Sequence, residues 1–227
     1  MQKLIAPYLA GQRPLRDGSA LLLEGDPRAD CRSGGVHSSP LARAPLHSRR
    51  FMKVPGFDMP LGEVKASLEP LRRPLSIAIL RARNPFNVGA IIRVAHSFLV
   101  KQVVLVGDEP FYQRAAMGMQ RYENLVYLPD DAALCAWAAE RGLPLLVFER
   151  EHARVDLWHA DLPEECLMVF GSETAGVPET LIAAAKQVIA IPMYGINNSF
   201  PVTVAAGIAM AEWTRRHFVA GSVEGRP

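Results

Sequence analysis

Short apolar runs of strand length alternate with longer helical patterns over most of this chain, and this alternation strongly limits its fold. Each run has four to six residues, and most are followed by a segment whose apolar residues recur every three or four positions. Repeated units of this kind join parallel strands through crossover helices. The sequence therefore predicts an α/β fold, with a mostly parallel sheet covered by helices on both faces.

The strands are expected at residues 75–80, 103–106, 125–128, 145–148, 166–170 and 188–191. The helices are expected at residues 87–99, 112–120, 130–141, 178–186 and 201–218. Around this α/β domain of residues 74–218, we expect a lead-in with one short helical turn (55–73) and a frayed C-terminal tail (219–227).

Residues 1–54 differ from the rest of the chain in composition and charge. They hold 9 Lys and Arg against 4 Asp and Glu, whereas residues 55–227 hold 16 against 19. Scattered Pro, Arg, Gly and Ser with no sustained period cannot bury much apolar surface, which predicts a disordered basic extension. A start codon placed too early is an alternative, and an organelle-targeting peptide is disfavoured by the acidic residues. A basic tail is compatible with a polyanionic partner.

The three cysteines, Cys31, Cys135 and Cys166, are an odd set without metal-ligand spacing. They favour reduced thiols in a cytoplasmic protein. No apolar run approaches the ~18 residues that a membrane helix needs, so no membrane association is expected. His152, Asp156 and His159 have a spacing that suits a metal on a helix face, but the stretch is predicted to be a polar loop, and no metal is expected.

The loop after the first predicted strand, RARNPFNVGAIIR, is a candidate ligand site because α/β sheets bind ligands at the carboxyl ends of their strands. Asn84 and Asn87 are suitable turn or N-cap residues, and Gly89 permits a close approach to the helix. Arg93 lies off the apolar stripe of that helix. Taken alone, the stretch fits equally well an ordinary capped helix with an exposed arginine.

A second loop, FGSETAGVPE, follows the predicted strand at 166–170. Gly171 and Gly176 permit tight turns, and Glu173 places a carboxylate at a strand's carboxyl end. The Lys-Ser/Thr pair of a phosphate-binding Walker loop is missing, so this stretch alone fits a simple β–α loop.

The third stretch, VIAIPMYGINNSFPVTVAAGIAMAEW, reads as a buried strand, a polar loop and a helix of small residues. Ser199 lies where the loop becomes the helix, and Pro201 suits the first turn because its missing N–H would be unpaired there. Free backbone N–H groups at such a junction favour ligand binding.

Together and in this order, the three stretches resemble the motifs of the SpoU (TrmH-type) RNA ribose methyltransferases of the SPOUT superfamily. Asn87-Val88-Gly89-Ala90 with Arg93 matches the first motif, and Gly171-Ser172-Glu173 with Gly176 the second. The third is matched by Ile191-Pro192-Met193 and Ser199. The resemblance covers residues 74–218. It implies a C-terminal trefoil knot that forms an S-adenosylmethionine pocket, a homodimer with sites near the subunit interface, and methylation of a ribose 2′-hydroxyl in tRNA or rRNA.

The resemblance also implies roles for individual residues. Arg93 would act on the hydroxyl, either as a base or by binding phosphate and stabilising the developing alkoxide, and Asn87 would orient Arg93 or the backbone around it. Glu173 would order its loop or form a hydrogen bond to the site, and Ser199 would close the third loop. The implied cofactor-binding residues are Gly171, Ser172, Glu173, Gly176, Ile191, Pro192, Met193, Ser199 and Val202.

The third motif departs from the family pattern at one position. The family usually has Ser-Leu-Asn-Val-Ser, whereas this chain has Ser199-Phe200-Pro201-Val202-Thr203. Pro201 has no amide side chain, so either Asn197 or Asn198 replaces it, or methyl transfer is impaired. Two readings therefore compete with an active enzyme. One is an RNA-binding protein of the same fold that has lost catalysis. The other is an unrelated nucleotide enzyme, which the lack of G-x-G-x-x-G after the first strand disfavours.

Several arginines near the first motif are candidates for RNA phosphate contacts. Alternatively, they form a solvated basic face. They are Arg72, Arg73, Arg81, Arg83, Arg93, Arg114 and Arg121.

Overall fold

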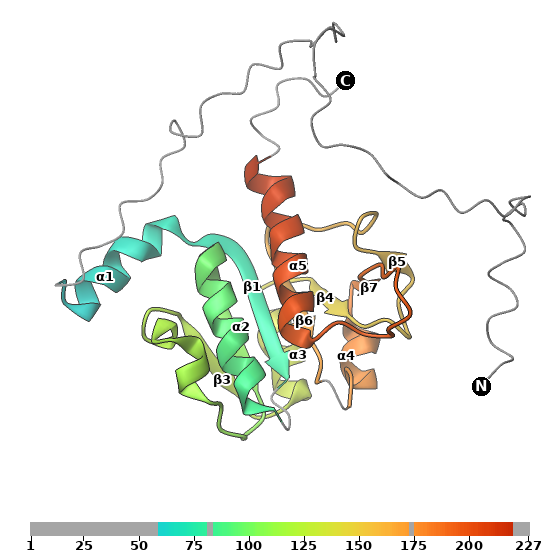
Figure 1. The fold of residues 1–227 in the computed structure, drawn as a ribbon, viewed down its shortest axis with the longest axis horizontal. Helices are drawn as coiled ribbons and strands as arrows, with labels where there is room; N and C mark the ends of the chain where they lie inside the picture. The colour runs from blue at the N-terminus through green and yellow to red at the C-terminus, as the bar shows by residue number, and fades with distance from the viewer. Residues whose placement is uncertain (1–58, 81–83, 173–174, 220–227) are drawn as a thin grey trace, which may run out of the picture. The chain divides into compact units, whose positions relative to one another are not determined.

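A computed structural model describes residues 59–80, 84–172 and 175–219 of the 227-residue chain. All of them belong to one compact unit, Lys53–Pro227. Their strands form a seven-stranded sheet in the order β3-β2-β1-β6-β4-β7-β5, and every neighbouring pair is parallel. The predicted α/β class with a parallel sheet is confirmed (Figure 1).

The strands are β1 (Arg73–Leu80), β2 (Val100–Val106), β3 (Leu125–Leu128), β4 (Leu145–Phe148), β5 (Val155–Asp156), β6 (Cys166–Phe170) and β7 (Gln187–Ala190). The α-helices are α1 (Leu61–Leu68), α2 (Pro85–Phe98), α3 (Asp131–Glu140), α4 (Glu179–Ala184) and α5 (Val202–Thr214). Short 3-10 turns occur at η2 (Glu69–Leu71), η3 (Gln113–Ala116) and η4 (Met119–Arg121), and η5 (Arg215–Val219) is a π-helical turn.

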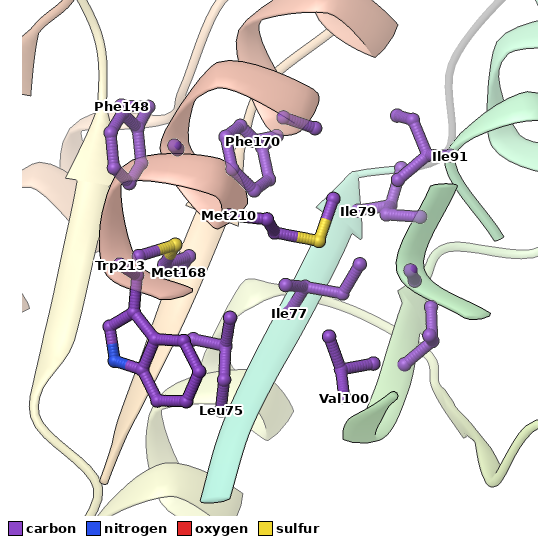
Figure 2. Close-up of a cluster of buried hydrophobic side chains, with 14 of the residues drawn as sticks. Leu75, Ile77, Ile79, Ile91, Val100, Phe148, Met168, Phe170, Met210 and Trp213 are labelled. Carbon is purple, nitrogen blue, oxygen red and sulfur yellow. The ribbon is translucent and has the colours of Figure 1, made fainter. Parts of the chain in front are cut away.

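Two apolar layers enclose the sheet. Helices α2 and α5 cover one face, where Ile77 and Ile79 of β1 meet Met210 and Trp213 of α5 (Figure 2). Helices α3 and α4 cover the other face, which includes Ala78 of β1. Alternate residues of β1 therefore enter different layers, as expected for a strand buried on both sides.

Helix α2 begins and ends where its sequence directs. The Asn84 side chain accepts a hydrogen bond from the Phe86 amide at 3.2 Å, and Pro85 occupies the first helical position. The last helical residue is Phe98, and the C-cap Leu99 has a left-handed backbone with φ 50°. Its buried residues are Val88, Gly89, Ile91, Ile92 and Ala95, which is the apolar face that the sequence predicts.

The predicted helix at residues 112–120 is wrong. The segment instead contains η3 and η4, separated by Met117 and Gly118, which have φ of 50° and 85°. Two consecutive left-handed residues cannot continue a right-handed helix. The Tyr112 amide donates to the Pro85 carbonyl at 2.9 Å, so this segment is held against the start of α2.

Three further differences concern the ends and edge of the fold. Strand β5, with two residues in a polar segment, is not expected from the sequence and forms only by pairing with β7. Helix α1 is longer than the expected single turn. The last helix begins at Val202, with Pro201 as its N-cap, and ends as an α-helix at Thr214 rather than Phe218.

Helices α2 and α5 lie side by side and begin at the sheet edge where β1 ends (Figure 1). A Cβ placed on Gly207 of α5 would lie 3.8 Å from the Val94 side chain of α2. The loops of the second and third motifs follow β6 and β7, and Asn87, Gly89 and Arg93 of the first motif lie on α2.

Candidate functional site

A cavity of about 690 Å³ opens at the carboxyl ends of β6, β4 and β7, which are neighbours in the sheet. Loops that follow each of the three strands form its walls, and the first turn of α5 closes one side. Seven residues predicted to bind the cofactor line it. They are Gly171, Ser172, Gly176, Ile191, Met193, Ser199 and Val202.

Other predicted residues are not in this lining. Pro192 lies between two lining residues but does not itself line the cavity. Glu173, Arg81 and Arg83 lie outside the described residues. Their predicted roles rest on the sequence alone.

The second-motif loop is a tight turn that depends on its two glycines. The Ser172 and Gly176 backbones bond each other in both directions, at 3.1 Å and 2.9 Å, and the Ser172 hydroxyl accepts from the Ala175 amide at 3.0 Å. Gly176 has φ 65°, which favours glycine. A Cβ on Gly171 would lie 2.5 Å from the Gly176 carbonyl. The two glycines thus allow the ends of this loop to approach each other beside the cavity.

The third loop brings an amide side chain to the cavity despite Pro201. Asn198 lines the cavity, whereas the Asn197 side chain donates to the Ser199 carbonyl at 3.3 Å. The Pro201 carbonyl accepts from the Val204 and Ala205 amides and so begins α5. Between the two candidates, Asn198 is the one placed where a ligand would lie.

Arg93 and Asn87 belong to α2 and do not line the cavity. Arg93 is exposed, and within the described part of the chain its guanidinium has no ion-pair partner. Among the same residues, the Asn87 and Arg93 side chains share no hydrogen bond. Arg93 therefore presents a free guanidinium on α2, the helix beside the wall-forming α5, and the expected contact from Asn87 is not observed.

Glu149 is a cavity residue that the motif search did not find. It directly follows β4, and its Oε1 accepts from the Arg150 amide at 2.7 Å and from the Glu151 amide at 3.3 Å. The signal was present, because Glu149 comes immediately after a predicted strand and the carboxyl ends of strands are where ligands bind. His152 from the same loop also lines the cavity.

Two of the arginines expected at RNA phosphates have other partners. The Arg72 side chain is 3% exposed and pairs with buried Glu123 at 3.0 Å, while also donating to the Tyr122 carbonyl at 2.6 Å. The Arg73 guanidinium lies 3.8 Å above the Phe218 ring. Arg72 in particular is unavailable to a phosphate, because its side chain is buried and binding a phosphate would remove a partner of the buried Glu123 carboxylate.

The loop of His152, Asp156 and His159 is tied together by Asp156. Its carboxylate accepts from the Trp158 and His159 amides and contacts His159 Nδ1 at 2.8 Å. The hydrogen bond from the His159 ring lowers the pKa of the Asp156 carboxyl. No cluster of three or more potential metal-ligating side chains occurs among the described residues.

Both described cysteines are free thiols. Burial raises the pKa of Cys166 to about 12, and burial also raises the pKa of Cys135. Cys166 lies inside β6 and is a core residue rather than a nucleophile. None of the described helices combines the length and apolar character that crossing a membrane requires.

Comparison with known proteins gives one consistent family. Residues 74–211 match the model of the SpoU rRNA methylase family. The tRNA (guanosine(18)-2′-O)-methyltransferase of Thermus thermophilus is 31% identical over 160 residues, covering 67% of this chain and 82% of the relative. The 23S rRNA (guanosine-2′-O-)-methyltransferase RlmB of Neisseria meningitidis is 27% identical, over 67% of this chain and 62% of its own length.

Solved structures agree with the sequence comparison. The SpoU methyltransferase AviRb from Streptomyces viridochromogenes, in complex with its cofactor AdoMet, superposes with a TM-score of 0.59 at 25% identity. That match covers 70% of this chain and 62% of AviRb. The chain therefore spans less than two thirds of AviRb and of the Neisseria enzyme, but most of the Thermus enzyme.

Proposed function

Because this chain belongs to the SpoU rRNA methylase family, we propose that it methylates a ribose 2′-hydroxyl of tRNA or rRNA with S-adenosylmethionine as the methyl donor. The observation that carries the proposal is the cavity at the ends of β6, β4 and β7. The second and third motifs of the family, which follow different strands of the sheet, both contribute residues to its walls.

The residues of the cavity fit this cofactor. Its volume of about 690 Å³ is within the range of small-molecule sites. Val177, Ile191 and Val202 offer apolar surface to a purine, while Ser172, Asn198 and Ser199 offer polar groups. S-adenosylmethionine supplies an activated methyl group on a sulfonium. In this proposal, Gly171, Ile191 and Met193 bind its adenine and ribose through their backbone, and Glu173 orders the loop.

Arg93 is proposed to act on the RNA rather than on the cofactor. A guanidinium carries five N–H donors and no acceptor, which suits a phosphate oxygen or a developing alkoxide better than proton abstraction. Its exposure on α2 and the absence of a competing carboxylate among the described residues support this role. Holding the phosphate beside the target ribose would fix the hydroxyl for in-line attack.

We further propose that the enzyme is a cytoplasmic homodimer with the C-terminal knot of its family. Arg93 does not line the cavity of its own chain, so in this proposal a second chain supplies the arginine that completes each site. Size-exclusion chromatography with light scattering tests the assembly, and a monomer at micromolar concentration would contradict it.

The function is tested by methyl transfer from labelled S-adenosylmethionine to total tRNA and rRNA. We expect Arg93→Ala to reduce transfer by at least about 100-fold, as for loss of a transition-state electrostatic contact. Cofactor affinity should be unchanged, because Arg93 is not in the cavity wall. Arg141→Ala is the matched control, since Arg141 is exposed, follows α3 on the other face of the sheet and is not among the arginines expected at RNA phosphates. Full activity of the Arg93 variant would remove this residue from the mechanism.

A further inference from the structure

Glu149 occupies the central position of the cavity floor. It is the first residue after β4, and β4 lies between β6 and β7, the strands that lead into the two motif loops. Its amide donates to the Ile189 carbonyl of β7 at 3.2 Å, so its backbone continues the sheet pairing. The position of this carboxylate is therefore fixed by the sheet rather than by a free loop.

The two oxygens of the Glu149 carboxylate have different surroundings. Oε1 accepts the Arg150 and Glu151 amides, which holds the side chain folded over its own loop. Oε2 would lie 2.9 Å from a Cβ on Gly176, another residue of the cavity lining. No described residue donates a hydrogen bond or forms an ion pair to Oε2. One oxygen thus anchors the side chain, and the other lies beside Gly176 in the cavity wall.

The missing Cβ of Gly176 is what leaves room for Oε2. A Cβ added to Gly176 would be closer to Oε2 than Cβ atoms come to other heavy atoms in folded proteins. The positive φ of Gly176 allows the tight turn of the second motif, and its lack of a side chain leaves space for the Glu149 carboxylate. The second-motif loop therefore accommodates Glu149 beside Gly176.

A carboxylate at the carboxyl end of a parallel strand is a common acceptor for ribose hydroxyls in α/β nucleotide sites. A cis-diol presents two O–H donors side by side, and an anchored carboxylate oxygen accepts them without further ordering. Apolar neighbours in the wall, Val177 and Ile189, suit the adjoining base more than the charged amino-acid end.

We propose that Glu149 binds the ribose diol of the methyl donor and thereby positions it in the cavity. This inference rests on the proposed function, since it assumes an adenosyl cofactor in this pocket. It adds to the cofactor site a residue that follows β4 and lies outside the family motifs, and it explains why a side chain at position 176 would interfere with Glu149.

The test is isothermal titration of the full chain with three unreactive ligands. S-adenosylhomocysteine has the adenine, the ribose and the amino-acid end. 5′-Methylthioadenosine has the adenine and the ribose but no amino-acid end, and 3′-deoxy-5′-methylthioadenosine also lacks the 3′-hydroxyl. Glu149→Gln keeps a carbonyl for the Arg150 and Glu151 amides and so preserves the loop. Glu140→Gln is the control, because Glu140 is an exposed acid on α3 outside the cavity lining and pairs with Arg141 at 3.3 Å.

We expect Glu149→Gln to weaken binding of S-adenosylhomocysteine and of 5′-methylthioadenosine by about tenfold or more, as for loss of a charged hydrogen bond, and Glu140→Gln to change it by less than about twofold. The wild type should bind 3′-deoxy-5′-methylthioadenosine about tenfold more weakly than 5′-methylthioadenosine. The Glu149→Gln variant should bind these two ligands equally well. This comparison of two ligands on one protein is insensitive to any loss of folding.

Two results would overturn the inference while leaving the function intact. In the first, Glu149→Gln weakens only S-adenosylhomocysteine, so the carboxylate recognises the amino-acid end. In the second, the hydroxyl deletion costs the same affinity in both proteins, so Glu149 does not contact the diol. Failure of the wild type to bind any of the three ligands would instead overturn the proposed function itself.

Discussion

At the scale of single residues, the substitution of Pro201 for the family's asparagine has a compensation in the loop before it. Asn198 brings an amide side chain to the cavity, whereas Asn197 uses its amide to hold the Ser199 carbonyl. We expect Asn198→Ala to reduce kcat/KM for methyl transfer by about tenfold or more, because a polar contact to the bound reactants is lost.

Asn197→Ala is the matched control for that substitution. It should reduce activity less, because its contact at 3.3 Å stays within the loop and is exposed. Steady-state kinetics with both variants separates the two asparagines. A larger loss for Asn197 than for Asn198 would show that loop order, rather than a replacement amide, makes the chain tolerate Pro201.

Glu212 is the buried acid on which the end of the chain depends. Arg215 and Arg216 donate to its carboxylate at 2.7 Å, and the Arg216 guanidinium also donates to the Leu157 and Ala160 carbonyls. The hydrogen bonds from Arg215, and then from Arg216, outweigh burial and hold the pKa of Glu212 at about 2. This network ties α5 to the segment after β5.

The lowered pKa predicts how stability depends on pH. The unfolded value is about 4.3, so ionised Glu212 stabilises the fold above that pH, and the contribution is lost as pH falls through about 2. Glu212→Gln should destabilise the protein by roughly 1–3 kcal/mol at pH 7. Urea unfolding between pH 7 and pH 3 should show a flatter pH dependence for the variant than for the wild type. Parallel profiles would show that other carboxylates cause the acid sensitivity.

At the scale of secondary-structure elements, the contact between α2 and the segment after β2 depends on Gly89. A Cβ at this position would lie 2.5 Å from the Tyr112 carbonyl and 2.9 Å from the Ala115 side chain. Glycine to alanine normally stabilises a helix. Here we expect Gly89→Ala to destabilise the fold by roughly 1–3 kcal/mol, because backbone must move to admit the methyl group.

Gly62→Ala in α1 is the control for this prediction, since nothing lies within 4 Å of its added Cβ. This variant should be neutral or slightly stabilised in the same urea or thermal unfolding experiment. Equal effects of the two substitutions would mean that the helix, rather than the packing, sets the response at Gly89.

The strands were predictable because burial on both faces leaves an unbroken apolar run. The ends of β3, β4 and β6 coincide with the predictions, and the second motif loop begins where β6 ends. The segment after Tyr112 was not predictable, because Ala115, Ala116 and Met117 have helical character and only the left-handed backbone at Met117 and Gly118 ends the helix. Strand β5 has no signal of its own, since it exists only as a partner of β7.

The candidate site was predictable where motifs mark it and not elsewhere. Gly171, Ser199 and Val202 were found by their motif spacing, and the cavity brings them together. Glu149 lies in no motif. Its place in the cavity follows from the strand order, which puts β4 between β6 and β7. Conversely, Arg72 appeared to be a surface base, and only tertiary structure places it against buried Glu123.

At the scale of the whole molecule, the division of the chain predicts that the N-terminal extension is dispensable for folding. Among the described residues the buried core begins at Leu68, and the unit that contains it begins at Lys53. Deletion of residues 1–54 should leave the thermal midpoint within about 2 °C of the full chain, because the core of the described residues is retained. Calorimetry of both proteins checks this, and aggregation of the shorter one would contradict the division.

The pairing of β1 with β6 has a consequence for the order in which this protein forms. Leu75 lies opposite Cys166, so the centre of the sheet joins segments far apart in the chain. Such pairing raises contact order and slows folding. The cavity lies at the ends of β6, β4 and β7 from the second half of the chain, and Val202 and Ala205 of α5 close it. Helix α5 in turn packs against α2 from the first half. Capture of the methyl donor should therefore be among the last events of refolding, and it signals that the two halves of the sheet have joined.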